Sequence, residues 1–437
     1  MDIFKNKLIK KLKNKSARIG IIGLGYVGLP LLVQFYKSGY NVLGFDIDKE
    51  KIKKLNSGLS YISHIQSKEI SNLSKKKFKV TNNFLLAKEV DALIICVPTP
   101  LKNKREPDLS FIIETTNSLL PYIKKGQVIS LESTTYPGTT EEELLPAIES
   151  KGFKIGKDFF LVYSPEREDP GNKSFKTKNI PKIVSGHSPE CLDVGKNLYK
   201  FTVKKVVPVS STKTAEITKL LENIYRAVNI GLVNEMKMLT DRMGIDIHEV
   251  IAAASTKPFG FTPFYPGPGL GGHCIPIDPY YLTWKAKKYG LNTRFIELAG
   301  EVNKNMPNWV INKIDETLKN KSFILKNAKV LVLGIAYKKN IDDMRESPAA
   351  ELMKILQERD AIISYSDPYV LKFPKMRKYN FNLKSIELSA NKIKKFDIVL
   401  LATDHDKFDY KLLQENAKLI IDTRGVYKKP YHNVVNA

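Results

Sequence analysis

A glycine-rich turn between two short apolar segments constrains the fold of this chain more than any other feature of its sequence. Residues 18–22 form an apolar run that is followed by Gly23, Gly25 and Gly28 in the spacing Gly-x-Gly-x-x-Gly. A helical pattern and a second apolar segment come next, and that segment ends in Asp46. A strand, a glycine turn, a helix, a strand and a terminal acid are together typical of the dinucleotide-binding βαβ unit.

Each glycine of this turn has its own physical role. Gly23 permits the tight turn, Gly25 lets the backbone approach a pyrophosphate, and Gly28 lets the helix pack on the strand. The amide groups at the helix N-terminus favour an anion. We therefore expect these three glycines, with Tyr26 and Val27 between them, to contact the cofactor.

Asp46 indicates which dinucleotide is bound. Its carboxylate, eighteen residues after Gly28, is placed to accept hydrogen bonds from the adenosine ribose hydroxyls. Its charge repels a 2′-phosphate, and Asp48 adds to that repulsion. The sequence therefore predicts NAD rather than NADP.

The rest of the chain predicts a helical region and a second sheet. Apolar runs typical of buried parallel strands occur at 90–97, 127–131 and 160–163. From 212 to 243 apolar residues recur at helical spacing, which predicts a helix roughly 45 Å long, and a further helical region extends to about 318. The opening α/β pattern then returns, with one glycine in place of three, at 329–337, 348–356, 397–402 and 419–422.

We therefore predict an α/β protein with two Rossmann-like α/β domains joined by a central helical domain that contains a long spine helix. A chain of 437 residues is long enough for two or three cores. The expected domains are 1–210, which binds NAD, 211–318, which is helical and carries the dimer contact, and 319–437, whose sheet has lost the dinucleotide fingerprint.

The net charge of +24 suggests a polyanionic partner, but the kind of basic residue argues against one. Only 10 of the 70 basic residues are arginine, the side chain on which phosphate and base recognition usually depends. We therefore expect no nucleic-acid partner and assign most of the lysines to a solvated surface.

The cysteines and the N-terminal region indicate the compartment. Cys96, Cys191 and Cys274 are too few and odd in number for a disulfide framework, which favours a reducing, cytoplasmic location. Residues 1–15 lack the apolar core of a signal peptide, and four glycines and a proline interrupt the apolar stretch 19–35. We expect no membrane span and no metal site, and we expect the N-terminal stretch to be a frayed basic extension rather than an amphipathic helix.

The glycine- and proline-rich segment 258–279 is the strongest candidate for the chemistry, because long loops of this kind are usually functional. Its four aromatic residues argue against disorder, since such side chains seek burial. Two adjacent glycines and a histidine precede Cys274, so a substrate can approach the sulfur closely. Nearby cations would make this thiol a nucleophile. The alternative is a buried, inert cysteine, which is the expected state of Cys96 and Cys191.

Lys219 and Asn223 lie four residues apart on the predicted long helix, so both project from one face. Such a pair either donates hydrogen bonds to an oxyanion or is an ordinary exposed pair. The spacing alone leaves both interpretations open.

These motifs together give the chain its resemblance to a known family. It resembles the UDP-glucose/GDP-mannose dehydrogenase family over essentially its whole length, and within that family it is most similar to the 6-dehydrogenases of UDP-N-acetylglucosamine. The motifs that carry the resemblance are Gly23-Leu-Gly-Tyr-Val-Gly-Leu-Pro30, Val97-Pro-Thr-Pro100, Glu132-Ser-Thr134, Ser164-Pro-Glu166-Arg167, Lys219-Leu-Leu-Glu-Asn223, Gly271-Gly-His-Cys274 with Asp278, and Lys338 with Arg345. The family implies three domains, and dimers or dimers of dimers built on the central helices. It also implies a four-electron oxidation of a sugar C6 alcohol to the acid with two NAD, for surface polysaccharide precursors.

The resemblance also implies catalytic roles. Cys274 attacks the aldehyde to give a thiohemiacetal, and a second hydride transfer leaves a thioester. Lys219 and Asn223 stabilise the oxyanions, and Asp278 orients a water or tunes the lysine.

Two further residues are assigned by the resemblance to the water that hydrolyses the thioester. Glu166, with Thr134, positions or deprotonates this water. A carboxylate suits this work only if burial or neighbouring groups bring its pKa toward the working pH.

The resemblance further implies which residues bind the two ligands. For NAD, it adds Thr99, Thr134 and Lys338 to the glycine turn and Asp46. For the UDP-sugar substrate, the residues are Glu166, Arg167, Lys219, Asn223, Tyr265, Gly267, Gly271, Lys338, Arg345 and Arg424.

Departures from the family pattern bear on the substrate. His273 and Ile277 stand where glucose-specific members commonly have serine and lysine, and the surrounding segment resembles the subgroup that acts on UDP-N-acetylhexosamines. UDP-N-acetylglucosamine is the favoured substrate, with UDP-N-acetylmannosamine, UDP-N-acetylgalactosamine and UDP-glucose as alternatives. Lys257 lies where many relatives place an arginine that reaches a neighbouring subunit's substrate, so either Lys257 substitutes or that contact is lost.

Two other functions are compatible with parts of the sequence. A two-electron hydroxyacid dehydrogenase shares the dinucleotide-binding domain, the long helix and the Lys219/Asn223 pair, but it has no use for Cys274, Glu166 or a second α/β domain. A basic NAD-binding module for nucleic acid or an anionic membrane would account for the charge, yet the chain has no arginine-rich stripe or readout motif.

Overall fold

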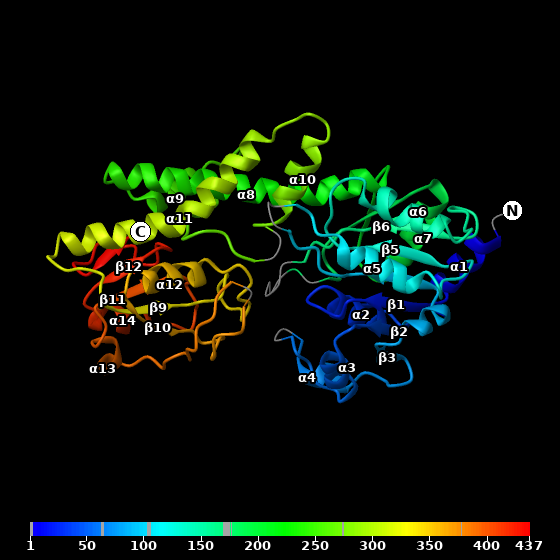
Figure 1. Ribbon diagram of the computed structural model, residues 1–437, viewed down its shortest axis with the longest axis horizontal. Helices are drawn as coiled ribbons and strands as arrows, with labels where there is room; N and C mark the ends of the chain where they lie inside the picture. Colours follow the sequence, from blue (N-terminus) through cyan, green and yellow to red (C-terminus); the bar gives the residue numbers. More distant parts are fainter. Residues whose placement is uncertain are drawn as a thin grey trace. The chain divides into compact units, whose positions relative to one another are not determined.

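The computed structural model describes residues 3–62, 65–102, 106–168, 175, 177–272, 275–376 and 378–437 (Figure 1). The chain divides into two compact units, and each is described by itself. Unit 1 comprises Met1–Glu222 and Tyr280–Asn292, and unit 2 comprises Asn223–Pro279 and Thr293–Ala437.

Unit 1 is built on a mostly parallel sheet. Its elements are α1 (Ile3–Lys13), β1 (Arg18–Ile22), α2 (Gly28–Lys37), β2 (Asn41–Phe45), α3 (Lys49–Asn56), α4 (Ser67–Ser71), β3 (Phe78–Thr81), the 3₁₀ helix η1 (Phe84–Glu89), β4 (Ala92–Ile95), α5 (Ser110–Leu119), β5 (Val128–Leu131), the π-helical turn η3 (Thr140–Leu144), α6 (Leu145–Glu149), β6 (Phe160–Tyr163), β7 (Lys182–Gly186), α7 (Pro189–Lys200) and β8 (Val206–Pro208).

The strand order of unit 1 confirms the predicted dinucleotide-binding fold. Within the described residues, eight strands form one sheet in the order β3-β2-β1-β4-β5-β6-β7-β8. Neighbouring strands run parallel, apart from the antiparallel pair β6 and β7. The chain order reverses between β1 and β4, and ligands of such sheets bind at the carboxyl ends of the strands at this switch point.

The N-terminal segment is an ordered helix, so the expectation of a frayed extension is wrong. Leu8 and Leu12 of α1 are 2% and 0% exposed, and they pack in a core cluster with Ile19 and Phe35. The Tyr40 hydroxyl also donates a 2.9 Å hydrogen bond to the Leu12 carbonyl. Because Leu8 and Leu12 are one helical turn apart, both point to the same side, and their burial folds a lysine-rich segment onto the unit.

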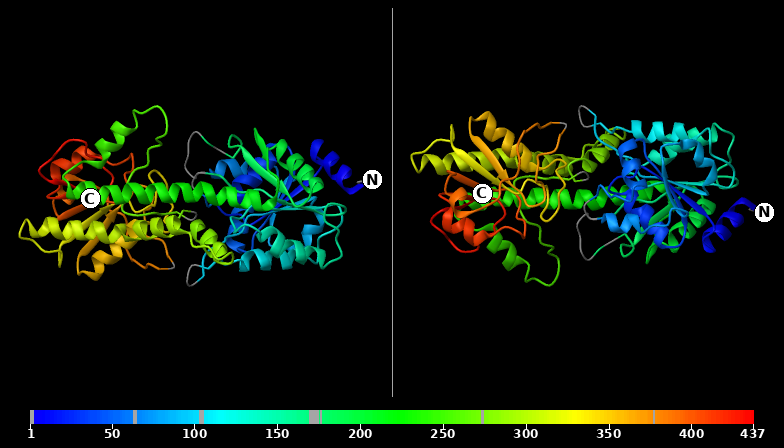
Figure 2. Two further views of the ribbon diagram at one scale, coloured as in Figure 1. Left: turned by 90° about the horizontal axis from the view of Figure 1, so that it is seen from above. Right: turned by 90° about the horizontal axis from the view of Figure 1, so that it is seen from below.

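α8 (Thr212–Arg242) is the long helix that the sequence predicts, and Figure 2 shows it as one continuous helix. The division between the units falls within it, after Glu222. The predicted apolar stripe is not buried as a whole, because Leu220 and Ile224 are buried whereas Leu221 and Leu232 are 63% and 57% exposed. Among the described residues, neither α8 nor any other helix combines the length and the apolar character of a membrane span.

Unit 2 contains the second α/β sheet. Its elements after α8 are α9 (Ile247–Ala254), the start of α10 (Asp278–Lys287), α11 (Arg294–Lys319), β9 (Lys329–Leu333), α12 (Pro348–Glu358), β10 (Ile362–Ser366), α13 (Ala390–Ile393), β11 (Ile398–Leu401), α14 (Tyr410–Asn416), β12 (Ile420–Asp422) and β13 (Val434–Asn436). In the part of the chain that the structure describes, five parallel strands follow the order β10-β9-β11-β12-β13. This is a doubly wound order with its switch point between β9 and β11.

Alternation along β9 shows how this sheet is covered. Val330 and Val332 pack in one cluster with residues of α11 and α12, whereas Leu331 and Leu333 pack in another with residues of α13 and α14. Successive side chains of a strand point to opposite faces, so helices cover both faces of the sheet. The predicted second Rossmann-like domain is therefore confirmed as a fold.

The aromatic residues of the 258–272 loop differ from the expectation that they are buried. Phe264 packs edge to face on Tyr225, with ring centres 5.6 Å apart. Phe259, Phe261 and Tyr265 are 72%, 40% and 58% exposed. The argument from burial therefore holds for Phe264 and is wrong for the other three.

The packing of α1 makes a testable prediction. Leu12→Ala should lower the free energy of unfolding by about 2–5 kcal/mol, because it leaves a cavity in the core of unit 1. Chemical denaturation followed by circular dichroism measures this change. Ile3→Ala on the same helix is the control, since Ile3 is 72% exposed. Equal stability of both variants and the unaltered chain would mean that α1 is not part of the core.

Candidate active site

The turn between β1 and α2 has the backbone that its glycines predict. Gly23 has a φ of +87°, and a Cβ built on it would lie 2.6 Å from the Cys96 carbonyl oxygen. A Cβ on Gly28 would overlap the Gly23 carbonyl oxygen. A Cβ on Gly25, in contrast, would meet no described atom within 4 Å. The fold itself requires two of the glycines, and the third leaves open the space through which a pyrophosphate reaches the backbone.

Asp46 lies at the carboxyl end of β2, where a ribose contact is expected. Its Oδ2 accepts from the Leu24 amide at 2.9 Å, and its Oδ1 accepts from the Asp48 amide at 2.9 Å. The Lys51 ammonium is 3.4 Å from Oδ2. Asp48 instead caps α3 by accepting from the amides of Glu50 and Lys51. The fixed carboxylate and the open glycine turn fit an adenine dinucleotide.

Three predicted residues follow adjacent parallel strands and therefore lie together at the carboxyl-terminal end of the sheet. Thr99, Thr134 and Glu166 come after β4, β5 and β6, respectively. The Thr99 carbonyl accepts from the Tyr281 hydroxyl at 2.5 Å, and Thr99 is buried. Thr134 and Glu166 are half-buried. The structure thus brings these residues to the same end of the sheet as the glycine turn.

A buried ion pair that the sequence analysis did not identify lies in the same unit. The Lys182 ammonium is 2.8 Å from Glu132 Oε2, and the side chains are 7% and 0% exposed. The Tyr199 hydroxyl donates to Glu132 Oε1 at 2.7 Å. Burial raises the pKa of Glu132, and Lys182 opposes that rise. Burial acts to lower the pKa of Lys182, but the charges of Glu132 and Glu166 outweigh it and raise that pKa. The one signal in the sequence was a lysine at the start of a buried strand.

Glu166 belongs to a pair of neighbouring carboxyl groups. The Glu168 amide donates to the Glu166 carboxylate, and both residues line a small pocket with Lys182 and Pro165. Burial and the Glu166 charge raise the pKa of Glu168 to about 8. A carboxyl group that holds a proton near neutral pH therefore lies two residues from the predicted base.

Arg167, predicted to bind substrate, has protein partners on two sides. Its guanidinium forms an ion pair with Glu222 of α8 at 2.7 Å and donates to the Pro181 carbonyl at 2.8 Å. These contacts tie the segment after β6 to α8.

Lys219 and Asn223 are buried, which excludes the interpretation of an ordinary exposed pair. Lys219 is 7% and Asn223 is 4% exposed. Asn223 Nδ2 donates to Asp278 Oδ2 at 2.5 Å, and Asp278 is the first residue of α10. The structure therefore brings two of the predicted catalytic residues into direct contact within unit 2. Cys274 and its neighbour His273 lie outside the described residues.

The 265–272 loop of unit 2 packs closely on predicted substrate-binding residues. A Cβ on Gly267 would lie 2.5 Å from an Arg424 guanidinium nitrogen. A Cβ on Gly271 would overlap the Tyr337 side chain. The next residue in the loop donates its amide to the Arg345 carbonyl at 2.9 Å. Glycine is thus needed at Gly271, where this loop meets the segment after β9, and Gly267 leaves room for the Arg424 guanidinium after β12.

Two buried asparagines, which sequence reasoning missed, fix the same loop. Asn234 Oδ1 accepts from the Gly267 amide at 3.0 Å, and Asn234 Nδ2 donates to Asn303 Oδ1 at 2.8 Å. Asn303 in turn donates to the Ala227 carbonyl at 3.0 Å. An asparagine in the middle of a helix gives no signal of this role until its partner is known.

Lys338 and Arg345 lie in the loop between β9 and α12. The Arg345 guanidinium binds the Asp343 carboxylate through Nε at 2.9 Å and Nη2 at 2.6 Å. Lys338 is half-buried. Tyr265, in the glycine-rich loop, is more than half exposed.

Comparison with known proteins covers nearly the whole chain. Residues 17–203 match the NAD binding domain of the UDP-glucose/GDP-mannose dehydrogenase family, residues 213–305 its central domain, and residues 331–429 its UDP binding domain. A UDP-N-acetyl-D-glucosamine 6-dehydrogenase from Pseudomonas aeruginosa is 34% identical, covering 90% of this chain and 92% of its own. A UDP-N-acetyl-D-mannosamine dehydrogenase from Pyrococcus horikoshii is 35% identical, covering 94% and 96%.

The fold agrees with these relationships. The solved structure of the UDP-N-acetyl-D-mannosamine dehydrogenase from Pyrococcus horikoshii superposes with a TM-score of 0.86 at 32% identity, covering 96% of this chain and 98% of its own. The chain therefore belongs to the UDP-glucose/GDP-mannose dehydrogenase family of NAD-dependent nucleotide-sugar dehydrogenases.

Proposed function

We propose that this enzyme oxidises the C6 alcohol of a UDP-N-acetylhexosamine to the uronic acid in two NAD-dependent steps, with UDP-N-acetylglucosamine as the best candidate substrate. The observation that carries the proposal is the buried contact of Asn223 with Asp278, because this carboxylate fixes the orientation of a desolvated amide donor, and such a donor stabilises an oxyanion far better than an exposed one. The glucosamine and mannosamine relatives are equally similar to the chain, so both sugars are tested below. The product would serve surface polysaccharide synthesis in the cytoplasm.

The oxidation to the acid depends on residues of the chain itself. When bound, NAD accepts a hydride from the sugar C6 carbon in each oxidation. The Cys274 thiolate attacks the intermediate aldehyde to give a thiohemiacetal, which the second oxidation converts to a thioester. The Asn223 amide nitrogen has two hydrogens, one of which is bonded to Asp278, and we assign the other to the substrate oxyanion together with the Lys219 ammonium.

Hydrolysis of the thioester needs a base for water. We assign this role to Glu166, with Thr134 orienting the water. The contact in which the Glu168 amide donates to the Glu166 carboxylate supports the assignment, because it fixes the position of that carboxylate.

We also propose that the functional domains are 1–210, 211–318 and 319–437. The three family matches, at 17–203, 213–305 and 331–429, fall inside these ranges and support the division.

A second proposal concerns assembly, which we infer to be a homodimer formed through α8. In unit 2 this helix exposes a stripe of large apolar side chains at helical spacing: Tyr225, Leu232, Met236 and Leu239. Exposed apolar stripes of this size usually mark a protein contact. A second copy of the chain offers an identical, self-complementary stripe.

The first prediction tests substrate and mechanism together. With NAD and a panel of UDP-N-acetylglucosamine, UDP-N-acetylmannosamine, UDP-N-acetylgalactosamine and UDP-glucose, the enzyme should give two NADH per sugar, with the highest kcat/KM on the first. Cys274→Ala should lose about 10³-fold or more of acid formation, because the thioester cannot form.

Cys191→Ala is the matched control for the thiol, because Cys191 is buried in α7. It should keep its activity. One NADH per sugar, with release of free aldehyde and an unaffected Cys274→Ala variant, would contradict the proposed mechanism.

The second prediction tests the dinucleotide site. Asp46→Ala should raise the KM for NAD about tenfold or more and reduce the preference over NADP, because the ribose hydroxyls lose their acceptor. Asp48→Ala is the control and should change this preference much less, since Asp48 caps α3. Steady-state kinetics with both cofactors measure the effect, and an unchanged preference in Asp46→Ala would exclude the assigned role.

The third prediction tests the dimer. Sedimentation velocity should show a dimer for the unaltered chain and a monomer for the double variant Leu232→Lys, Leu239→Lys, because four buried charges would face each other across the contact. Leu59→Lys, on an exposed leucine of unit 1, should leave the dimer intact. A double variant that sediments like the unaltered chain would refute the α8 interface.

A further inference from the structure

The first strands of the two sheets end in the same way. Gly23 after β1 and Gly334 after β9 have φ angles of +87° and +71°. Their amides donate to the last residue of the neighbouring strand, at 2.8 Å to the Phe45 carbonyl and at 2.9 Å to the Ser366 carbonyl. A Cβ on Gly334 would overlap the Thr403 carbonyl, as one on Gly23 would crowd the carbonyl after β4. The second sheet therefore keeps the first part of the dinucleotide-binding geometry.

The carboxylates after the second strands also correspond. Asp367 follows β10 as Asp46 follows β2. Asp367 Oδ2 accepts from the Ile335 amide at 2.7 Å, as Asp46 Oδ2 accepts from the amide after its glycine. Asp367 Oδ1 accepts from the Tyr369 amide, two residues further on, at 2.8 Å, and Asp46 Oδ1 does the same. Asp367 thus holds the place of a ribose-binding acid.

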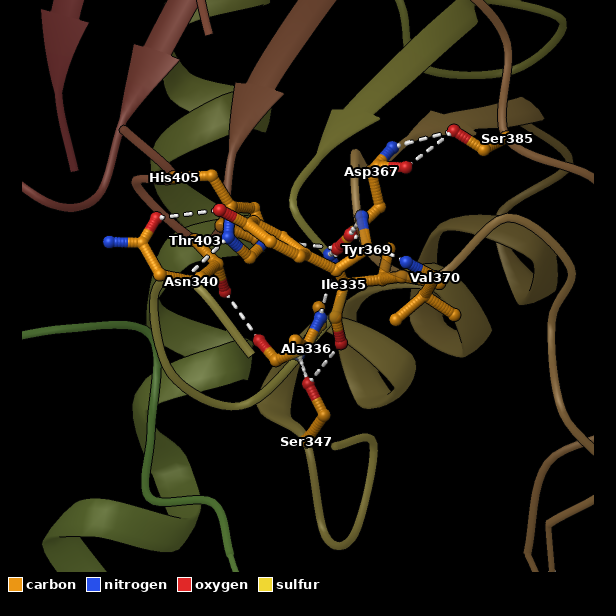
Figure 3. Close-up of polar contacts among 12 residues, drawn as sticks. Ile335, Ala336, Asn340, Ser347, Asp367, Tyr369, Val370, Ser385, Thr403 and His405 are labelled. Atoms are coloured by element: carbon orange, nitrogen blue, oxygen red, sulfur yellow. Dashed lines mark hydrogen bonds and ion pairs between the residues drawn. The ribbon is translucent and has the colours of Figure 1, made fainter. Parts of the chain in front are cut away.

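The difference between the two sites is the third partner of the acid. Asp46 meets the ammonium of Lys51, a side chain that is 34% exposed and can move aside. Asp367 Oδ2 meets His405 Nε2 at 3.0 Å (Figure 3). Neither side chain has any exposed area. His405 follows β11, the strand next to β9, so its imidazole lies at the carboxyl ends of the strands, where ligands of such sheets bind.

The other imidazole nitrogen binds the backbone of the loop that follows β9. His405 Nδ1 accepts from the Asn340 amide at 2.9 Å, so the proton lies on Nε2. Asn340 adopts a φ of +64°, and its side-chain oxygen accepts from the Asp406 amide at 3.0 Å. The imidazole therefore links a carboxylate of the sheet to the middle of the 334–347 loop.

The ends of this loop are fixed by two hydroxyl groups. Ser347 donates to the Ile335 carbonyl at 2.7 Å, and Thr403 donates to the Ala336 carbonyl at 2.6 Å (Figure 3). Lys338 and Arg345 lie between these ends, on either side of the residue that His405 holds. The imidazole at the centre of the loop therefore helps to fix the conformation of the segment that carries both cations.

We propose that His405 is a positioning residue for the UDP-sugar: by joining Asp367 to the Asn340 amide, it holds the loop that presents Lys338 and Arg345 to the nucleotide diphosphate. This role rests on the proposed action on a UDP-sugar and on the assignment of Lys338 and Arg345 to that substrate, which the family resemblance implies. An apolar residue would fill the same space at a lower desolvation cost, but it would leave the Asn340 amide and one side of Asp367 without their partner. The loop would then populate its binding conformation only in part, and affinity would fall in proportion.

The test compares two variants of His405. His405→Phe fills the space without either hydrogen bond, and His405→Gln offers an amide donor and acceptor at a similar separation. His405→Phe should raise the KM for the UDP-sugar and the Kd for UDP about tenfold, while kcat changes less than about twofold. His405→Gln should recover most of the loss.

Leu413→Ala is the matched control for stability. Leu413 is fully buried in the cluster that contains Leu331 and Leu333, and it makes none of the hydrogen bonds that hold the loop, so the variant destabilises the domain without removing a contact of His405 to the loop. It should leave the KM for the UDP-sugar unchanged. An equal rise in KM in Leu413→Ala and His405→Phe at matched loss of Tm would overturn the proposal, because general destabilisation would then explain it.

Two measurements without substrate separate this proposal from the proposed function. Hydrogen exchange of ligand-free enzyme should speed up at residues 335–345 in His405→Phe and not in Leu413→Ala. In the unaltered chain labelled with ¹⁵N-histidine, one imidazole should carry a slowly exchanging Nε2 proton. Unchanged exchange in His405→Phe, or absence of that proton signal, overturns the proposal whatever sugar the enzyme uses. If hydrogen exchange changes as expected but the enzyme turns over no UDP-sugar, the proposed function is refuted and the structural role of His405 in the loop stands.

Discussion

Both sheets of this enzyme depend on one interaction, in which a carboxylate at the end of the second strand accepts the backbone amide that follows a glycine at the end of the first. Asp46 and Asp367 make this contact at 2.9 Å and 2.7 Å. It fixes the direction in which the chain leaves the first strand, and so it sets the position of the turn or loop that faces the ligand. The two sheets differ in whether the carboxylate can still accept a hydrogen bond from a bound ligand.

In unit 1 that side remains accessible, since the competing Lys51 side chain is partly exposed. In unit 2 the buried His405 occupies it. The same geometry therefore supports a cofactor site in one sheet and an internal brace in the other. The loop after β9 does not have the glycine turn of a pyrophosphate site. It carries Lys338 and Arg345, the two cations that we assign to the diphosphate of the substrate. A duplicated fold thus supports two different ligand sites.

Much of the fold could be predicted because the signals were local. The spacing of three glycines, a continuous apolar strand and a terminal Asp46 are all read within 30 residues of sequence. The prediction failed where tertiary packing decides: α1 folds because Leu8 and Leu12 meet a core formed by later strands, and no local pattern distinguishes this from a frayed basic segment. Phe259 and Phe261 show the converse error, because their aromatic character predicted burial and the structure leaves them exposed.

The candidate site was predictable to a similar degree. Spacing placed Lys219 and Asn223 on one helix face, but their burial and the contact of Asn223 with Asp278 depend on where α10 begins. Lys182 and His405 each stand alone in the sequence, with partners 50 and 38 residues away. Such residues acquire a role only through the sheet topology that brings strand ends together.

The comparison of Asp46 with Asp367 leads to one claim on which the account depends: the first sheet binds a dinucleotide and the second does not, because His405 occupies the position beside Asp367. Calorimetric titration of the unaltered enzyme with NADH, in the absence of UDP-sugar, tests it most directly. The account predicts one NADH bound per chain. Two NADH bound per chain with comparable affinity would show that the second sheet still accepts a dinucleotide and would contradict it.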